Sequence, residues 1–95
     1  MSAAEFSTWK LYILRCGDGS LYTGIAVDVQ KRLDVHRSGK GAKYTRGRGP
    51  LELVHTEVCG THSDALRREL AVKALSREEK EKLIAAFGQA NPCTQ

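Results

Sequence analysis

Leu11-Tyr12-Ile13-Leu14 and Leu21-Tyr22-Thr23-Gly24-Ile25 are two short stretches, each with one tyrosine, on either side of Gly17-Asp18-Gly19. Aromatic and branched residues are abundant in both, which predicts strands over residues 9–16 and 21–25. The segment between them has turn chemistry, because glycine accepts positive φ and aspartate hydrogen-bonds its own backbone. We therefore predict a β-hairpin, in which the two tyrosines could lie near each other on one face.

A helix, a long loop and a third strand are predicted after the hairpin. Asp28 is placed to cap a helix that carries Val29 and Leu33 on its apolar stripe and ends at Ser38-Gly39. Glycines and basic residues fill positions 39–50, which predicts a mobile, cationic loop. Positions 51–58 alternate apolar with polar residues, which predicts the third strand.

Two further helices are predicted in the last third of the chain. The first is capped by one of three residues that precede its apolar stripe: Thr61, Ser63 or Asp64. The second begins with a capping box, in which Ser76 and Glu79 satisfy each other's backbone donors. We expect this last helix to run through Phe87 and to stop at Gly88.

The predicted order of elements is β-β-α-β-α-α, which favours the α+β class. A small three-stranded antiparallel sheet with helices packed on it is the natural arrangement for this order. We expect one domain over residues 9–87, a flexible N-terminal arm over residues 1–8 and a polar C-terminal tail over residues 88–95. A chain of 95 residues is long enough for one compact core.

The composition argues against membrane and disulfide-based classes of protein. Hydrophobic residues make up 41% of the chain, and no apolar run approaches the roughly 20 residues of a spanning helix. The three cysteines, Cys16, Cys59 and Cys93, are odd in number and far apart, so we expect free thiols rather than a disulfide or a zinc site. We expect a cytoplasmic protein, and a monomer.

The net charge of +4 is unevenly placed along the chain. Seven basic residues lie between positions 31 and 48, against Asp34 alone: Lys31, Arg32, Arg37, Lys40, Lys43, Arg46 and Arg48. A basic stretch of this kind suits a polyanion, with nucleic acid as the first candidate. The alternative is a solvated basic loop with no partner.

Arg32 and His36 are the first pair of residues with a chemical interpretation. At a spacing of i, i+4 they project from the same face of the predicted helix. A guanidinium binds phosphate bidentately, and a histidine can donate to a leaving oxygen or hold a second phosphate oxygen. The alternative is two exposed polar residues on an amphipathic helix.

Tyr12 and Tyr22 could place two hydroxyl groups around a reacting phosphate, although both rings could equally fill the core, since tyrosine is a favoured strand residue. Glu69 and Lys73 are spaced for a helix salt bridge. Glu69 also borders the apolar stripe of its helix, and a carboxylate there could hold Mg²⁺. Gly24 could allow a phosphate or the start of the helix to approach the strand closely, or it could be an ordinary glycine at a strand end.

Taken together, these residues resemble the motifs of the GIY-YIG nuclease family, in particular its small stand-alone, single-domain members. The first motif ends in a tyrosine, matched by Tyr12, although Lys10 stands where its glycine would be. The second motif is matched by Tyr22-Thr23-Gly24. Three further positions complete the resemblance, which extends over residues 9–83: Arg32, His36 and Glu69.

The resemblance implies an endonuclease that hydrolyses phosphodiester bonds with one divalent cation, Mg²⁺ or Mn²⁺, held by Glu69. It implies that Arg32 neutralises charge on the phosphate, that Tyr12 rather than Tyr22 takes a proton from water, and that His36 assists. A free phenol has a pKa of about 10, so forming the phenolate near pH 7 costs about 4 kcal/mol, to be offset by nearby positive charge.

We expect DNA as the substrate, with RNA left open, and low sequence specificity, because no element suits reading of the major groove. Structure-selective cutting in DNA repair or recombination fits this expectation. Nine residues are predicted to contact the substrate: Gly24, Lys31, Arg37, Lys40, Lys43, Tyr44, Arg46, Arg48 and Lys73. The alternatives are a nucleic-acid-binding module without catalysis and an adaptor that binds a protein partner.

Overall fold

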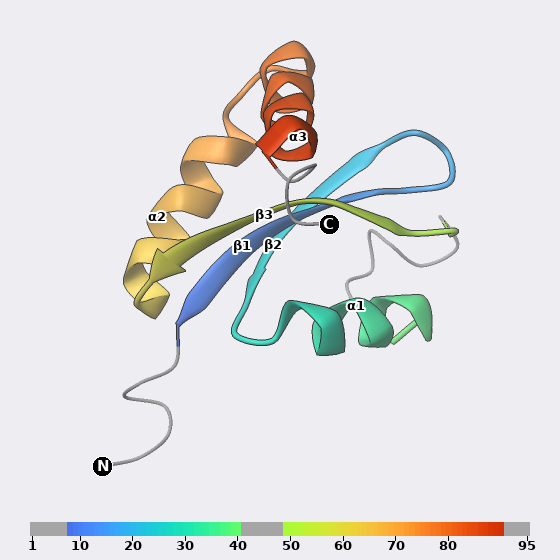
Figure 1. Cartoon of the computed structure of the whole chain (residues 1–95). Helices are drawn as coiled ribbons and strands as arrows, with labels where there is room; N and C mark the ends of the chain where they lie inside the picture. Colours follow the sequence, from blue (N-terminus) through green and yellow to red (C-terminus); the bar gives the residue numbers. More distant parts are fainter. Residues whose placement is uncertain (1–7, 41–48, 91–95) are drawn as a thin grey trace.

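A computed structural model describes residues 8–40 and 49–90 of the chain as a three-stranded sheet with three helices (Figure 1). The strands are β1 (Trp9–Arg15), β2 (Leu21–Ala26) and β3 (Glu52–Gly60). The sheet has the order β2-β1-β3, and β1 pairs antiparallel with both neighbours. The central strand is therefore the first one in the chain, and β2 and β3 each leave one edge unpaired within this sheet.

The hairpin between β1 and β2 forms as the sequence predicts. Gly19 has a φ of +86°, which glycine adopts without the steric cost that other residues would meet. The side chain of Asp18 accepts hydrogen bonds from the backbone and hydroxyl groups of Ser20 at 3.0 and 2.6 Å. The turn fixes a register in which Tyr12 lies opposite Gly24 and Leu14 lies opposite Tyr22.

The helices are α1 (Val29–Arg37), α2 (His62–Lys73) and α3 (Arg77–Ala90). Asp28 caps α1 by accepting from the backbone of Lys31 at 3.0 Å, as predicted. Of the three candidates for the cap of α2, Thr61 is the one used, in a capping box with Asp64. The predicted capping box at the start of α3 is also present.

Each face of the sheet carries its own hydrophobic cluster because side chains alternate along a strand. Tyr12 and Leu14 of β1 pack with Val29 and Leu33 of α1 on one face. Leu11 and Ile13 pack on the other face, where α2 and α3 contribute further residues: Val72, Leu83 and Ile84. Figure 1 shows α1 below the sheet and α3 above it. The molecule therefore has three layers, with β1 buried at the centre.

Two element boundaries differ by two or more residues from the sequence predictions, and several others differ by one. The third strand extends to Gly60, two residues beyond the alternating pattern, because Lys10 and Trp9 continue the pairing with Val58 and Gly60. The last helix does not stop at Gly88 but continues to Ala90. Glycine costs a helix interior only about 1 kcal/mol relative to alanine, and a helix ends there only where the backbone also turns.

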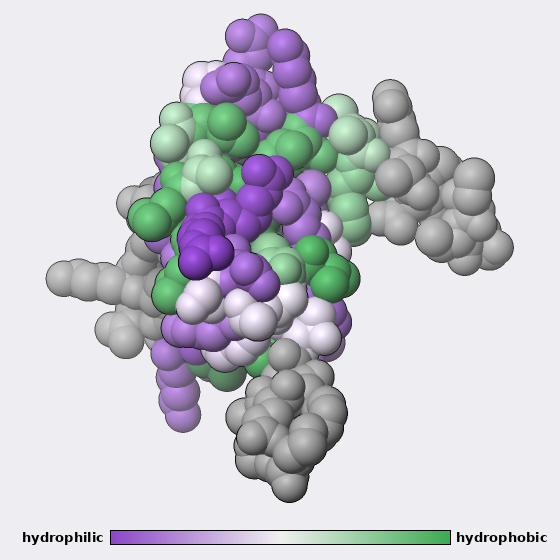
Figure 2. Space-filling model, turned by 90° about the vertical axis from the view of Figure 1, so that its left-hand side faces the viewer, coloured by the Kyte–Doolittle hydropathy of each residue, from purple (hydrophilic) through white to green (hydrophobic). Residues whose placement is uncertain are grey.

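The outer surface around α2 is mixed in character. Figure 2 shows the side that is on the left of Figure 1, where green hydrophobic groups lie beside purple hydrophilic ones. Exposed apolar side chains in the described residues include Val58 on β3 and Leu66 and Leu70 on α2. No helix of the described segments is both long and apolar enough to cross a membrane.

Candidate active site

The two tyrosines lie on the face of the sheet that α1 covers. Tyr12 comes from the central strand and Tyr22 from the edge strand, and the register places them diagonally on the same face. Their ring centroids are 6.3 Å apart. The structure therefore places the two phenols on one face of the sheet, as the predicted hairpin allowed.

His36 reaches these tyrosines from α1. Its Nε2 atom lies 2.8 Å from the Tyr12 hydroxyl oxygen, and its ring centroid lies 5.9 Å from that of Tyr12 and 5.2 Å from that of Tyr22. The His36 side chain is buried, and only 2% of the residue is exposed. The sequence left open the possibility that His36 is an exposed surface residue. In the structure it is buried and hydrogen-bonded to the Tyr12 phenol.

The direction of the hydrogen bond between Tyr12 and His36 depends on which ring nitrogen of His36 carries the proton. Burial, and then the positive charge of Arg32, lower the pKa of His36 from its ordinary value. A neutral imidazole accepts at its unprotonated nitrogen. Tyr12 is the donor and His36 Nε2 the acceptor in the tautomer that carries its proton on Nδ1.

The Tyr12 phenol is held in its neutral form. Burial raises the pKa of Tyr12 to about 12; the neighbouring Tyr22 adds to the rise, and Arg32 acts in the opposite direction. Only 1% of Tyr12 is exposed. Arg32, half-buried on the helix turn before His36, therefore acts on both members of the hydrogen-bonded pair. At neutral pH the pair is a phenol beside a neutral imidazole.

Gly24 has a specific steric role in this arrangement. A Cβ atom added to Gly24 would lie 2.5 Å from the Tyr12 hydroxyl oxygen and 2.6 Å from the adjacent ring carbon. The Tyr12 ring therefore extends from the central strand across Gly24 of the edge strand. The close approach that the structure shows at this glycine is made by the Tyr12 phenol, and approach of a phosphate to Gly24 stays a prediction.

Glu69 approaches the site from the opposite side of the sheet. Its helix, α2, packs with the cluster around Leu11 and Ile13, whereas Tyr12 belongs to the cluster on the other face. The side chain of Glu69 is 18% exposed and forms an ion pair with Lys73 at 3.4 Å, as the i, i+4 spacing predicts. Lys73 in turn lines a hollow with Tyr22 and Thr23 of the edge strand.

A divalent cation fits this site only in the manner of a weakly held Mg²⁺ or Mn²⁺. Within the described residues, no group of three or more His, Cys, Asp or Glu side chains is close enough to hold a metal. Mg²⁺ keeps several waters and can bind through one carboxylate when substrate phosphates supply the remaining oxygens. Glu69 could supply that carboxylate, with Lys73 as its competing partner.

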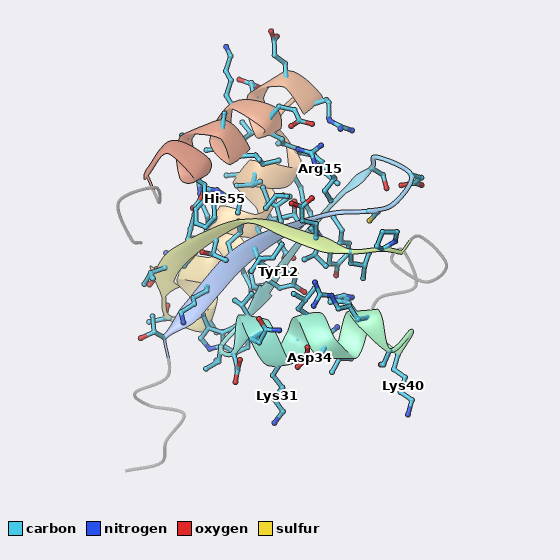
Figure 3. The ribbon with its side chains drawn as sticks, turned by 45° about the vertical axis from the view of Figure 1, so that its right-hand side comes forward. Tyr12, Arg15, Lys31, Asp34, Lys40 and His55 are labelled. Atoms are coloured by element: carbon cyan, nitrogen blue, oxygen red, sulfur yellow. The ribbon has the colours of Figure 1, made fainter. Side chains whose placement is uncertain are left out.

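The other seven predicted substrate-binding residues, besides Gly24 and Lys73, fall into three groups. Lys31 and Lys40 point away from the sheet in Figure 3, on the outer side and at the end of α1. Arg37 donates to the backbone carbonyl of Leu51 at 3.1 Å, which ties α1 to the start of β3. Four predicted residues lie outside the described segments: Lys43, Tyr44, Arg46 and Arg48.

Residues that the sequence did not suggest also border the site. Lys80 of α3 and Thr23 of β2 line the hollow that contains Tyr22 and Lys73. Trp9 lines an apolar groove with Lys31 and Arg32 at the other end of β2. Nothing in the sequence marked Lys80, because its proximity to β2 depends on how α3 docks against the sheet.

The three-layer fold, the tyrosine pair on adjacent strands and the arginine and histidine of α1 define a nuclease-type domain. The GIY-YIG catalytic domain matches residues 8–82, and the chain belongs to the GIY-YIG family, a family of nucleases. Among its relatives, a UPF0213 protein of Sodalis glossinidius is 52% identical over 86 residues, which cover 90% of this chain and 80% of that protein.

Two solved structures share the fold. The solution NMR structure of the UPF0213 protein BH0048 from Bacillus halodurans is 52% identical, with a TM-score of 0.56 over 85% of this chain and 86% of that chain. The solution NMR structure of the protein EF2693 from E. faecalis is 40% identical, with a TM-score of 0.59 over 86% of this chain and 88% of that chain. The predicted fold class and family are both confirmed.

Proposed function

We propose that this protein is a divalent-metal-dependent endonuclease that hydrolyses phosphodiester bonds in DNA with low sequence specificity. The observation that carries the proposal is the 2.8 Å hydrogen bond between the Tyr12 hydroxyl and His36 Nε2, beside Arg32. A buried phenol, a neutral imidazole and a guanidinium supply a proton path and a phosphate ligand in one place. Membership of a nuclease family supports the same conclusion.

In the proposed mechanism, Tyr12 and His36 act together on the attacking water. Forming a free phenolate from a group with a pKa of about 12 costs about 7 kcal/mol at pH 7, more than the sequence alone suggested. The cost is avoided if the Tyr12 oxygen accepts the water proton while its own proton passes to His36 Nε2, with His36 starting in the tautomer protonated at Nδ1. Water then becomes hydroxide, Tyr12 stays neutral and His36 becomes an imidazolium.

Arg32 is proposed to bind the non-bridging oxygens of the phosphate and to stabilise the charge that grows on them during attack. Tyr22, on the edge strand, is proposed to orient the phosphate or the water. Glu69 would hold the cation, which when bound supplies Lewis-acid stabilisation of the phosphate and of the departing oxygen. Low specificity follows from contacts to the backbone of the nucleic acid rather than to base edges.

The experiment is a cleavage assay with purified protein. Labelled single-stranded, duplex, flap and branched DNA, and RNA, are incubated with Mg²⁺, with Mn²⁺ and with neither. We expect metal-dependent cutting of DNA that is lost in Arg32→Ala and in Glu69→Ala. Binding without cutting under every condition would favour the non-catalytic binding module, and cutting retained by both variants would identify a contaminating nuclease.

The choice of substrates also tests the biological role that we propose. Preferential cutting of nicked, flapped or branched DNA would support a function in DNA repair or recombination. Equal cutting of all DNA forms would contradict structure selectivity, and cutting of RNA alone would contradict DNA as the substrate.

A further inference from the structure

A hollow of about 210 Å³ lies against the edge strand, on the side of the sheet where α2 and α3 pack. It is lined by residues from three elements: Leu21, Tyr22 and Thr23 of β2, Lys73 of α2 and Lys80 of α3. Its volume is below the range usual for sites that enclose a whole small molecule. The hollow is therefore suited to a small group that is part of a larger ligand.

The polar groups around the hollow favour an anion. Lys73 and Lys80 line it from two different helices, and Thr23 lines it from the edge strand and carries a hydroxyl. The Lys80 ammonium is held by no ion pair within the described residues, whereas Lys73 has Glu69 at 3.4 Å. A phosphate is the anion that the proposed substrate offers in every nucleotide.

The positive charge of Lys80 is also unfavourably placed with respect to the dipole of its own helix. It lies in the first turn of α3, where the helix dipole favours acidic residues such as Glu78 and Glu79. Helix stability therefore gives no reason for a lysine at this position. The backbone donor of Glu79 is already bonded to Ser76, so an anion here would bind through the lysine side chains.

The start of α3 is fixed in place relative to the hairpin. Arg77 donates to the backbone carbonyl of Gly19 at 2.8 Å and to Glu81 at 2.8 Å. Glu81 also accepts two hydrogen bonds from Arg15 of β1 at 3.0 and 2.9 Å. Because these contacts flank Lys80 in sequence, its backbone is held beside β2 before any ligand arrives.

Tyr22 lies on the edge strand between the hollow and the candidate active site, with its ring on the face that α1 covers. It lines the hollow, and its ring centroid lies 5.2 Å from that of His36 and 6.3 Å from that of Tyr12. We propose that Lys73 and Lys80 bind a backbone phosphate of the nucleic acid that neighbours the phosphate to be cleaved. This proposal rests on the proposed function, since it takes Tyr12, Arg32 and His36 as the site of cleavage.

The test compares Lys80→Ala with Lys82→Ala, a lysine two positions along the same helix that is exposed and does not line the hollow. Binding of a labelled DNA oligonucleotide is followed by fluorescence anisotropy without divalent metal, at several salt concentrations. Lys80→Ala should reduce the steepness of log K against log salt by about 0.7–0.9, the value for one lost phosphate contact. Lys82→Ala should leave the slope unchanged, and Lys80→Arg should restore it.

A scan with methylphosphonates locates the phosphate. Phosphates are neutralised one at a time. At one position, next to the cleavage site, the neutral group should weaken DNA binding by the wild-type protein but leave DNA binding by Lys80→Ala unchanged. In cleavage, Lys80→Ala should raise KM and leave kcat nearly unchanged, because the contact is made equally before and during reaction. Its melting temperature should not fall, since it removes a positive charge from the first turn of a helix.

Equal losses in Lys80→Ala and Lys82→Ala would overturn the subsite and indicate only a general effect of charge. Methylphosphonate sensitivity that persists in Lys80→Ala would overturn it as well. Failure of the proposed function gives a different result, in which the wild-type protein binds DNA with the Lys80-dependent slope but cuts none of the substrates.

Discussion

At the scale of single residues, the hydrogen bond between Tyr12 and His36 determines how the site could work. The sequence indicated that Arg32 and His36 share a helix face and that the two tyrosines could share a sheet face. It could not indicate that the Tyr12 ring crosses Gly24 or that His36 is buried, because both depend on distances between elements. In the proposed mechanism, Tyr12 therefore works with His36 rather than as a free phenolate.

Replacing Tyr12 by phenylalanine removes the proposed proton path but preserves the packing of the ring. We expect the cleavage rate to fall by about 10²–10⁴, the usual value of general-base assistance. DNA affinity should be nearly unchanged, because Arg32 and the basic residues, rather than the Tyr12 hydroxyl, are proposed to hold the phosphates. Single-turnover cleavage and anisotropy measure the two quantities separately. Unchanged turnover would remove Tyr12 from this role.

The pH dependence of cleavage distinguishes the proton relay from a free phenolate base. His36 can accept a proton only when it is neutral, and its pKa lies below the ordinary value of about 6.5. The rate should therefore rise as pH increases through that pKa and level off by neutral pH. A phenolate with a pKa of about 12 would instead make the rate rise through pH 9 and beyond. His36→Ala should abolish the acidic limb of the profile.

At the scale of elements, α1 carries both Arg32 and His36, so its N-terminal cap supports the site. Asp28 accepts from the backbone of Lys31 at 3.0 Å. Asp28→Ala should lower stability by about 1 kcal/mol, the usual cost of losing an N-cap. Asp28→Asn should retain most of the wild-type stability, because asparagine also caps helices. Chemical denaturation of the two variants measures the difference in the free energy of unfolding. Equal stability of Asp28→Ala and the wild type would show that packing alone holds α1.

The elements themselves were largely predictable, whereas their relative placement was not. Turn residues, capping boxes and alternation identified all three strands and all three helices, because these signals act within a few residues. The face against which α2 packs, opposite the one that carries the Tyr12 ring, is set by contacts such as Val72 with Leu11 and Ile13. No spacing within one segment encodes those contacts.

At the scale of the whole molecule, Glu81 joins the two ends of the fold. It accepts hydrogen bonds from Arg15 of β1 and Arg77 of α3, and Arg77 reaches the hairpin at Gly19. Figure 3 shows Arg15 between the hairpin and α3, on the side of the sheet away from α1. Loss of this junction would loosen α3, and with it Lys80, relative to the edge strand.

Hydrogen bonds from Arg15, and then from Arg77, lower the pKa of Glu81 to about 2. A carboxyl whose pKa is depressed in the folded state contributes stability above its unfolded pKa, near 4.5, and loses it as pH falls towards about 2. Glu81→Gln should therefore lower the melting temperature modestly at pH 7, since the pair is partly solvent-screened.

The same variant should match the wild type near pH 2, where Glu81 is becoming protonated in both the folded and unfolded chains. Thermal melts between pH 7 and pH 2 measure the difference. Glu57 keeps its own ion pair with Arg68 in both proteins, so it affects both curves equally. A stability difference that stayed constant down to pH 2 would mean that the substitution acts through packing and that the ion pairs do not secure α3.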